Sequence, residues 1–384
     1  MKFKYNISII GGAGHVGFPL GLIFASKKLK VNLIDKNSYN LSLIKKGKCP
    51  FKEDLAPKYL KKYKKNISTS TNIVDVKYSK NIIICIGTPI AKNLNPKKEA
   101  LFKIFKKIKK IVKPNQNIIV RSSIYINAMQ EIKNKFKFQN ITYCPERIVQ
   151  GKSLIELPKL PQLVSGFEEK SVKNSKILFS KICKKVITTT VEESELIKLF
   201  SNSFRFVHFA ISNQFYMMCE ELGLSYRKIR KIMKYGYDRN NFIPSAGFAS
   251  GPCLSKDTMQ LSSFFNHKFL LGKIAMDINH GLPNFIIKNL KKKMSLKNKT
   301  IGILGLSFKA ETDDIRDSLS IELIKLLKKN KIKYLSNDPY YKFKNNTSVS
   351  KLIDKSNIII LAIPHKVYSK LKIPKNKIFI NIWQ

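Results

Sequence analysis

A glycine-rich turn near the N-terminus constrains the fold of this chain more than any other feature. The apolar run Ile7-Ser-Ile-Ile10 leads into Gly12-x-Gly14-x-x-Gly17, and a helical pattern follows. In such a motif the first glycine permits a tight turn, the second lets the backbone approach a pyrophosphate, and the third lets helix and strand pack closely. The sequence therefore predicts a strand, turn and helix whose N-terminus binds a dinucleotide.

An acidic residue indicates which dinucleotide binds. Asp35 ends the next apolar run, where a carboxylate accepts hydrogen bonds from the adenosine ribose and repels a 2′-phosphate, so NAD is favoured over NADP. His15 and Val16 lie inside the turn and Thr88 follows a later strand, so we place all three in the same cofactor site. A glycine turn that serves packing alone is the alternative.

Apolar runs alternate with helical stretches through the first half of the chain. The runs that predict buried strands are Ile7–Ile10, Val31–Ile34, Ile82–Ile86, Ile118–Val120 and Ile141–Tyr143. This alternation predicts βαβ units and a parallel sheet. From Val191 to Leu222 one helical pattern runs without Pro or Gly, too long for an ordinary globular helix, so we expect it to bridge two domains. A second strand–glycine pattern starts at Thr300.

The predicted fold class is α/β, with two Rossmann-like doubly wound domains joined by a long helix and a small helical central domain. We place the domains at residues 1–190, 191–296 and 297–384. No apolar run approaches the roughly 20 residues of a membrane span. The N-terminus lacks the pattern of a signal peptide, so we expect a cytoplasmic location and no membrane partner.

The charge of the chain does not indicate a nucleic-acid partner. The formal net charge is +47, but 65 of the 72 basic residues are Lys, scattered over every segment. A nucleic-acid-binding protein with a degenerate Rossmann domain, the alternative from another class, needs its basic residues on one face with interleaved aromatics. The six cysteines show no zinc spacing, so we expect no metal.

One cysteine differs from the other five. Cys253 follows Gly251-Pro252, precedes Lys256 and Asp257, and leads into a helical pattern. A helix N-terminus and a nearby lysine both favour the thiolate, which makes Cys253 a candidate nucleophile. A buried cysteine in a structural loop is the alternative.

Polar residues also recur on one face of the long helix. Glu195, Lys198 and Asn202 are spaced i, i+3 and i+7, opposite an apolar stripe. A solvated helix face is the alternative. Glu146 and Arg147 follow a predicted strand, at the sheet edge where parallel sheets place residues that contact ligands.

In their order and spacing, these segments resemble the nucleotide-sugar 6-dehydrogenases, the UDP-glucose/GDP-mannose dehydrogenase family. The matching segments are Gly12–Leu20, Thr88-Pro89, Tyr143–Gly151, Lys198–Asn213, Gly247–Asp257 and Gly302–Ser318. The forms Cys144-Pro145-Glu146-Arg147 and Asn202-Ser-Phe-Arg205 are nearest to the UDP-N-acetylmannosamine dehydrogenase branch. Gln150 stands where UDP-glucose members carry a second glutamate.

The resemblance implies a four-electron oxidation of the C6 hydroxyl of a nucleotide sugar to the uronic acid, with NAD as the oxidant. Cys253 would form a thiohemiacetal and then a thioester. Lys198 and Asn202 would stabilise the oxyanion, Asp257 would orient the attacking water, and Glu146 would assist hydrolysis as a base.

The resemblance assigns further residues. Ser123 stands where many members carry Thr, and its hydroxyl has a less restricted rotamer than that of a threonine. The resemblance implies that Ser123 holds the catalytic water and, with Lys256, contacts the cofactor. The residues implied to bind substrate are Glu146, Arg147, Lys198, Asn202, Arg239, Gly247 and Lys309. The implied substrate is a UDP-N-acetylhexosamine used in polysaccharide biosynthesis. The alternatives are UDP-glucose and, more distantly, the substrate of a single-hydride hydroxyacid or 6-phosphogluconate-type dehydrogenase.

We also expect a homodimer. The aromatic residues along the predicted long helix exceed what one bridging helix can bury against its own domains; they are Phe204, Phe206, Phe209, Phe215 and Tyr216. The resemblance places Arg239 where it reaches the substrate of a neighbouring subunit.

Overall fold

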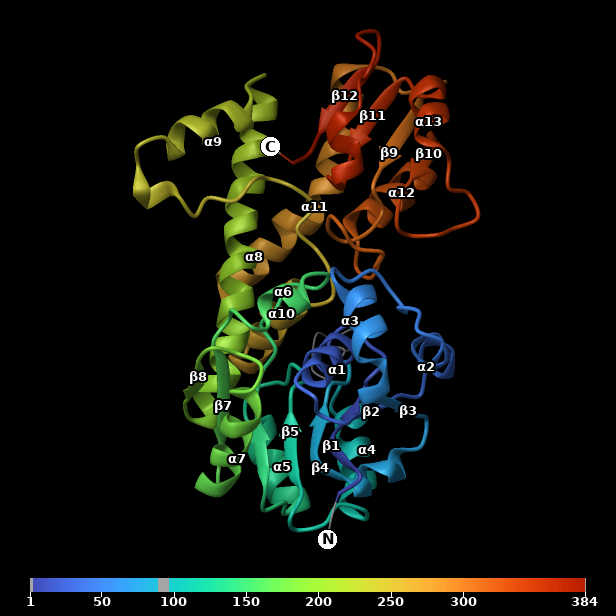
Figure 1. Cartoon of the computed structure of the whole chain (residues 1–384). Helices are drawn as coiled ribbons and strands as arrows, with labels where there is room; N and C mark the ends of the chain where they lie inside the picture. Colours follow the sequence, from blue (N-terminus) through green and yellow to red (C-terminus); the bar gives the residue numbers. More distant parts are fainter. Residues whose placement is uncertain (1–2, 89–96, 384) are drawn as a thin grey trace. The chain divides into compact units, whose positions relative to one another are not determined.

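The computed structural model describes residues 3–88 and 97–383. Pro89, part of one matching segment, lies outside these residues. The chain forms two compact units, Met1–Phe200 and Ser201–Gln384, each described here by itself (Figure 1). The division falls inside the long helix, and the predicted boundaries at residues 190 and 296 stay predictions.

An eight-stranded sheet forms the centre of the first unit, in the order β3-β2-β1-β4-β5-β6-β7-β8. The strands are β1 (Tyr5–Ile10), β2 (Val31–Ile34), β3 (Ile67–Ser70), β4 (Ser79–Ile84), β5 (Asn117–Val120), β6 (Ile141–Tyr143), β7 (Gln162–Gly166) and β8 (Val186–Thr188). All neighbours are parallel except β6 and β7. The strand order reverses at β1 and β4, which is where doubly wound sheets bind ligands.

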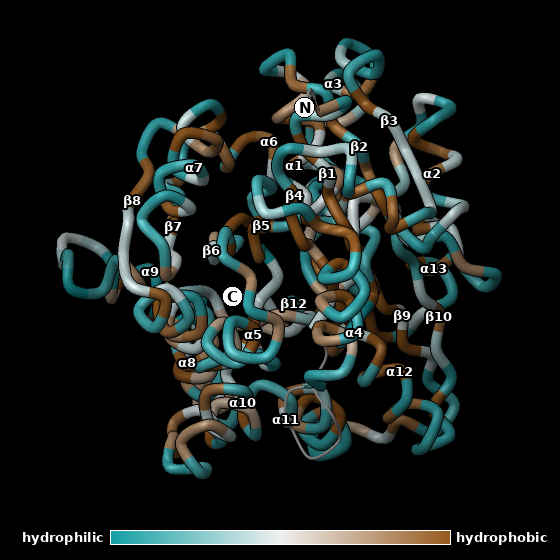
Figure 2. Tube along the Cα trace, turned by 90° about the horizontal axis from the view of Figure 1, so that it is seen from below, coloured by the Kyte–Doolittle hydropathy of each residue, from teal (hydrophilic) through white to brown (hydrophobic). Residues whose placement is uncertain are grey.

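Helices cover both faces of this sheet. They are α1 (Gly17–Ser26), α2 (Ser38–Lys45), α3 (Ala56–Tyr63), α4 (Lys98–Lys109), α5 (Ala128–Phe136), α6 (Ser153–Glu156) and α7 (Glu169–Phe179), with the short turns η1 (Lys64–Asn66) and η2 (Ile73–Tyr78). One core joins the sheet to α1, α3 and α7, and another joins it to α4 and α5. Successive side chains of β1 alternate between them, since Ile9 belongs to the first core and Ile10 to the second. Figure 2 shows the apolar character of β1, β4 and β5. The α/β doubly wound prediction is confirmed.

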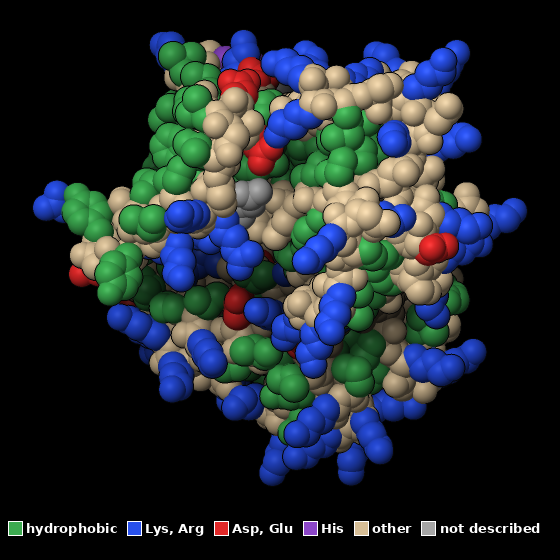
Figure 3. Space-filling model, turned by 90° about the horizontal axis from the view of Figure 1, so that it is seen from above, with side chains coloured by type: hydrophobic (Ala, Val, Ile, Leu, Met, Phe, Trp, Pro, Cys, Tyr) green, Lys and Arg blue, Asp and Glu red, His purple; other side chains and the backbone are tan. Residues whose placement is uncertain are grey.

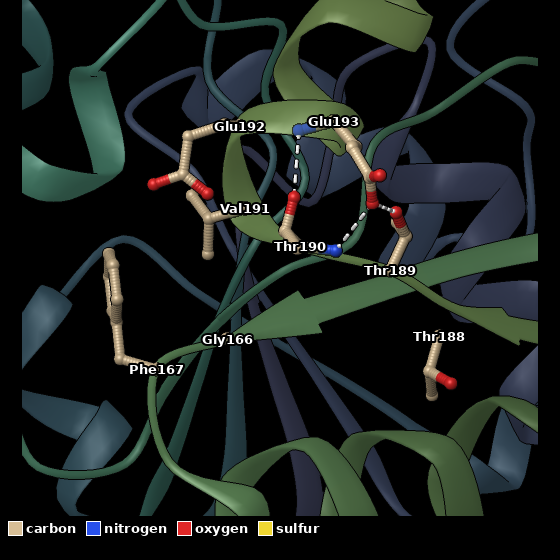
Figure 4. A pocket seen from close by; sticks show the side chains of 8 residues that line it. All are labelled: Gly166, Phe167, Thr188, Thr189, Thr190, Val191, Glu192 and Glu193. Atoms are coloured by element: carbon tan, nitrogen blue, oxygen red, sulfur yellow. Dashed lines mark hydrogen bonds between the residues drawn. The ribbon is translucent and has the colours of Figure 1, made fainter.

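The long helix α8 (Val191–Glu221) is a single helix of 31 residues, as predicted. A capping box sets its start: the N–H of Glu193 donates to the Thr190 hydroxyl at 3.2 Å, and the N–H of Thr190 donates to the Glu193 carboxylate at 3.0 Å. Figure 4 shows these bonds beside a cavity of about 430 Å³ at the edge of the sheet. These two bonds satisfy backbone N–H groups at the start of α8 and fix where the helix begins, which sets the direction in which the residues of the second turn point.

The second unit combines helices with a four-stranded parallel sheet of order β10-β9-β11-β12. Its elements after α8 are α9 (Tyr226–Lys234), η3 (Asp238–Asn240), α10 (Leu254–Phe264), α11 (Leu270–Lys293), β9 (Thr300–Leu304), α12 (Leu319–Lys329), β10 (Lys333–Asn337), α13 (Val349–Lys355), β11 (Ile358–Leu361), η4 (Lys366–Lys370) and β12 (Ile378–Asn381). One core runs from α8 and α11 into β9 and β11. Among the described residues, no helix has the length and apolarity needed to cross a membrane.

Candidate active site

The glycine turn after β1 has the geometry of a dinucleotide site. A Cβ atom on Gly12 would lie 2.8 Å from the carbonyl oxygen of Ile9, and one on Gly17 would lie 2.3 Å from that of Gly11. Packing within the turn therefore requires glycine at both positions. At Gly14 the nearest atom to such a Cβ would be 3.4 Å away, an ordinary van der Waals distance, so packing within the turn does not itself require glycine there. In a dinucleotide turn this glycine lets the backbone approach the pyrophosphate.

Asp35 completes this site from the end of β2. Its Oδ2 accepts the N–H of Ala13 at 3.0 Å, and its Oδ1 accepts the N–H of Asn37 at 3.0 Å. Each carboxylate oxygen has two lone pairs, and Asp35 is half-buried, so the side chain stabilises the turn and still has acceptor capacity for ribose hydroxyls. These residues fit NAD.

The loops that follow β4 and β5 are joined at the same sheet edge. The hydroxyl of Thr88 donates to the backbone carbonyl oxygen of Ser123. Both residues were predicted for the cofactor site, and the bond brings them together beside the strand-order reversal.

Glu146 belongs to a network that was not predicted. The fully buried Arg121 donates from Nε to Oε2 of Glu146 at 2.8 Å, donates again from Nη2, and donates from Nη1 to Gln162 at 2.8 Å. The Oε1 of Glu146 accepts the N–H groups of Arg147 at 2.8 Å and Ile148 at 3.0 Å. This geometry makes Glu146 an anchor of the loop after β6, and its proposed role as a base stays a prediction.

The same loop contacts the glycine turn. The Nε2 of Gln150 lies 3.2 Å from Nδ1 of His15, and the His15 ring packs against that of Phe51 with the centroids 4.0 Å apart and the planes tilted by 42°. The buried Glu53 accepts the N–H of Ser153 at 2.6 Å. Burial raises the pKa of Glu53 against the opposing effect of the hydrogen bonds from Ser153. The cofactor turn and the loop that carries Glu146 are thus tied together.

All six cysteines lie in the described residues, and Cys253 is the exposed one. Burial raises the pKa of Cys85 and Cys144 to about 12 and that of Cys49 to about 11. Those thiols stay protonated, whereas Cys253 is accessible at the N-cap of α10.

Two glycines let the loop before α10 pack closely. Gly251 has a φ of +102°, and a Cβ there would lie 2.3 Å from the ring of Phe308. Its N–H donates to the carbonyl oxygen of Asp317 at 3.3 Å. A Cβ on Gly247 would lie 2.4 Å from the indole of Trp383. The loop that positions Cys253 is therefore held by residues from the C-terminal part of the same unit.

A buried carboxylate lies one turn beyond the thiol. Asp257 is completely buried, and its Oδ2 accepts Nδ2–H of Asn202 at 2.6 Å. Nζ of Lys256 lies 3.2 Å from Oδ1 of Asp257. The backbone N–H of Asp257 donates to the carbonyl oxygen of Cys253 at 2.9 Å. The second unit thus brings four of the predicted residues together.

The other predicted substrate-binding residues differ in their exposure and in their contacts. Lys198, in the first unit, is 7% exposed and lies one turn before Asn202 on α8. The Arg147 guanidinium donates to the carbonyl oxygen of Pro161. Arg239 is exposed on η3, and Lys309 is half-buried after β9. Their substrate contacts stay predictions.

The turn after β9 resembles the glycine turn after β1, but its acidic residue, Asp338, is buried. Asp338 directly follows β10 as Asp35 directly follows β2, and it accepts the N–H of Leu306 at 2.7 Å. Burial raises the pKa of Asp338, but hydrogen bonds from His365 and the N–H of Tyr341 outweigh this effect and hold it at about 2. Asp338 and His365 are both buried, so this acid is not available to a ribose as Asp35 is.

Comparison with known proteins defines the class of enzyme. Three domain models match the chain: an NAD binding domain over residues 5–187, a central domain over 192–280 and a UDP binding domain over 302–383. The chain is therefore an NAD-dependent dehydrogenase. It belongs to the UDP-glucose/GDP-mannose dehydrogenase family, as the sequence motifs predicted.

Individual relatives agree with this assignment. The UDP-N-acetyl-D-mannosamine dehydrogenase of Methanococcus maripaludis is 26% identical over 94% of this chain and 86% of its own length. The structure of UDP-D-ManNAc dehydrogenase from Pyrococcus horikoshii has a TM-score of 0.88 at 23% identity, covering 98% of both chains. A UDP-glucose dehydrogenase from Pyrobaculum islandicum has a TM-score of 0.89 at 18% identity, covering 99% of this chain and 94% of its own. At these identities the two structures establish the shared fold.

Proposed function

We propose that this chain oxidises the C6 hydroxyl of UDP-N-acetyl-D-mannosamine to a carboxylate with NAD. Relatives that match it along nearly the whole chain are named UDP-N-acetyl-D-mannosamine dehydrogenases, and a UDP binding domain model covers its C-terminal part. The Cys144-Pro145-Glu146-Arg147 form and Gln150 support an acetamido sugar over glucose. UDP-glucose is the second candidate, because a UDP-glucose dehydrogenase shares the fold.

The accessible thiol of Cys253 is the observation that carries this proposal. The thiol lies at the start of α10, with Asp257 and its partners Lys256 and Asn202 one turn away. A nucleophile placed before a helix can capture an aldehyde covalently, which keeps a reactive intermediate on the enzyme.

The oxidation of the alcohol to the carboxylate proceeds in two hydride transfers and a hydrolysis. When bound, NAD supplies the hydride acceptor for both oxidation steps. The Cys253 sulfur adds to the C6 aldehyde to give a thiohemiacetal, whose oxidation leaves a thioester. Water then breaks the sulfur–carbon bond, so alcohol, water and two NAD⁺ give carboxylate, two NADH and three protons. Lys198 stabilises the oxyanion, and Asp257 orients the water.

We infer that the active form is a homodimer built on α8 and α9. Apolar side chains are exposed along one stripe of α8, at Phe204, Ile211, Phe215 and Met218, and at Leu222 directly after the helix. Contiguous apolar surface of this kind marks interaction sites. Phe206 and Tyr216, two of the five aromatics expected on this surface, are instead buried within the second unit. The exposed Arg239 follows α9, where it is available to a partner subunit.

Nucleic-acid binding has no comparable support. Figure 3 shows Lys and Arg in several parts of the visible face, interspersed with hydrophobic and uncharged side chains. A cytoplasmic role in polysaccharide biosynthesis is part of the proposal.

A substrate panel tests the sugar assignment. We would measure kcat/KM for UDP-N-acetyl-D-mannosamine, UDP-glucose and GDP-mannose at one NAD⁺ concentration by NADH absorbance. A pocket built for the acetamido group leaves polar groups unpaired with a 2-hydroxyl, so we expect UDP-glucose to be roughly 5- to 150-fold poorer. Equal or better turnover of UDP-glucose would make the assignment wrong.

A further inference from the structure

Glu195 caps a helix that is distant in sequence. It lies in the second turn of α8, and its carboxylate is completely buried. Its Oε2 accepts the N–H of Asn127 at 2.6 Å, and its Oε1 accepts the N–H of Met129 at 3.0 Å. These N–H groups belong to the N-cap and the second residue of α5, which a capping side chain ordinarily satisfies.

The residue at the N-cap of α5 does not cap its own helix. Asn127 occupies the N-cap position with φ +67°, and within the described part of the chain its side chain makes no capping hydrogen bond. A carboxylate at a helix N-terminus also interacts favourably with the helix dipole. Glu195 therefore replaces a local cap with one from another helix.

This cap joins two segments that carry predicted catalytic residues. Asn127 ends the segment that follows β5 and contains Ser123, whose carbonyl oxygen accepts the Thr88 hydroxyl. Lys198 lies one turn after Glu195 on α8. The capping box at Thr190 and Glu193 sets the rotation of α8 just before this turn (Figure 4).

We propose that Glu195 is a positioning residue for the oxidation, which holds the Ser123 segment in register with the turn of α8 that carries Lys198. This inference rests on the proposed function. Glu195 acts through these two segments. The sequence had placed it on one polar face of the helix with Lys198 and Asn202, but in the structure its carboxylate binds the N-terminus of α5.

The charged surroundings make this cap sensitive to pH. Burial raises the pKa of Glu195 to about 7, the two N–H donors lower it, and the carboxylates of Glu192 on the same helix and Glu131 on α5 raise it. Glu131 is itself bound by Nζ of Lys98 at 2.7 Å and by the hydroxyl of Tyr125 at 2.8 Å. Protonation removes the charge that strengthens both capping bonds, so the register should loosen as the pH falls below neutral.

The test compares Glu195→Gln with Glu192→Gln, which removes the same charge from an exposed position in the first turn. In glutamine one of the two oxygens is replaced by an NH₂ group, which donates, so the N–H group that faces it loses its acceptor. We expect kcat of Glu195→Gln with UDP-N-acetyl-D-mannosamine to fall about 10-fold or more, the scale set by misplaced reacting groups, with KM for NAD little changed. The part of the kcat–pH profile that falls near pH 7 should disappear in this variant. Glu192→Gln should keep the wild-type kcat above pH 7, and its fall in kcat should remain but move to lower pH, because this variant removes one of the carboxylates that raise the pKa of Glu195.

Hydrogen exchange gives a readout that needs no variant. In the wild type, protection of the amides of Asn127 and Met129 should decrease together with kcat as the pH falls through about 7. Wild-type kinetics in Glu195→Gln, or pH-independent protection of these amides, would overturn the inference while the proposed function stands. A wild-type enzyme that reduces no NAD with any nucleotide sugar would instead overturn the proposed function, and the inference with it.

Discussion

Replacing Arg121 with methionine should destabilise the first unit by about 3–5 kcal/mol, because the change leaves the Glu146 carboxylate buried without its cation. Arg121 is 1% exposed and Glu146 is 7% exposed. The guanidinium donates twice to Glu146, once to Gln162 and once to the carbonyl oxygen of Cys144 at 3.2 Å. Methionine fills much of the same volume and donates none of these bonds.

A double variant separates the charge effect from packing. Combining Arg121→Met with Glu146→Gln removes both charges, so the double variant should be more stable than Arg121→Met by about 2 kcal/mol or more. Urea unfolding followed by far-UV circular dichroism measures the free energies. Additive costs, or a cost of Arg121→Met below about 1 kcal/mol, would refute the buried ion pair as the anchor of Glu146.

Four further changes test other parts of the structure. Gly251→Ala should destabilise the second unit by about 2 kcal/mol or more, since it strains a positive φ and overlaps an aromatic ring; the Trp383 fluorescence transition in urea measures this. Asp35→Ala should weaken NAD binding by about 1–3 kcal/mol in calorimetric titration, and an unchanged Kd would exclude it as the ribose ligand. The pKa of Asp338 is lowered from 3.8 to about 2, so its ionised form stabilises the fold above that range, and this contribution is lost as the pH falls from about 4 to about 2. Acid unfolding of Asp338→Asn should lack this contribution, which is worth about 2 kcal/mol. Phe204→Glu should shift sedimentation toward the monomer, and an unchanged dimer would place the interface elsewhere.

The sequence predicts the central strands well and the edge strands poorly. β1, β2, β4, β5 and β6 have near-continuous apolar runs because both of their faces are buried. The strands that the sequence did not reveal include β3, with the polar sequence Ile-Ser-Thr-Ser, and the three-residue β8, whose residues are half-buried or exposed. Their pairing depends on neighbouring strands rather than on a local apolar pattern.

In the candidate site, too, the sequence predicted some features and did not reveal others. Local patterns predicted the glycine turn, Asp35 and the Cys253 loop. The partners that hold Glu146 and Glu195 are 25 and 66–68 residues away, and Gln150 meets His15 across 135 residues, so no local pattern could reveal these contacts. One useful indication was present: Arg is rare in this Lys-rich chain, and Arg121 proves to be the buried bidentate donor.

Counting NADH and acid formed per nucleotide sugar consumed, in the wild type and in Cys253→Ala, tests the covalent role of Cys253 most directly. Cys183→Ala is the matched control, because it removes a thiol outside the proposed site. We expect two NADH and one carboxylate per sugar for the wild type and the control, and no uronic acid from Cys253→Ala although it still binds the substrate. One NADH per sugar in the wild type, or normal uronic acid production by Cys253→Ala, would contradict this role.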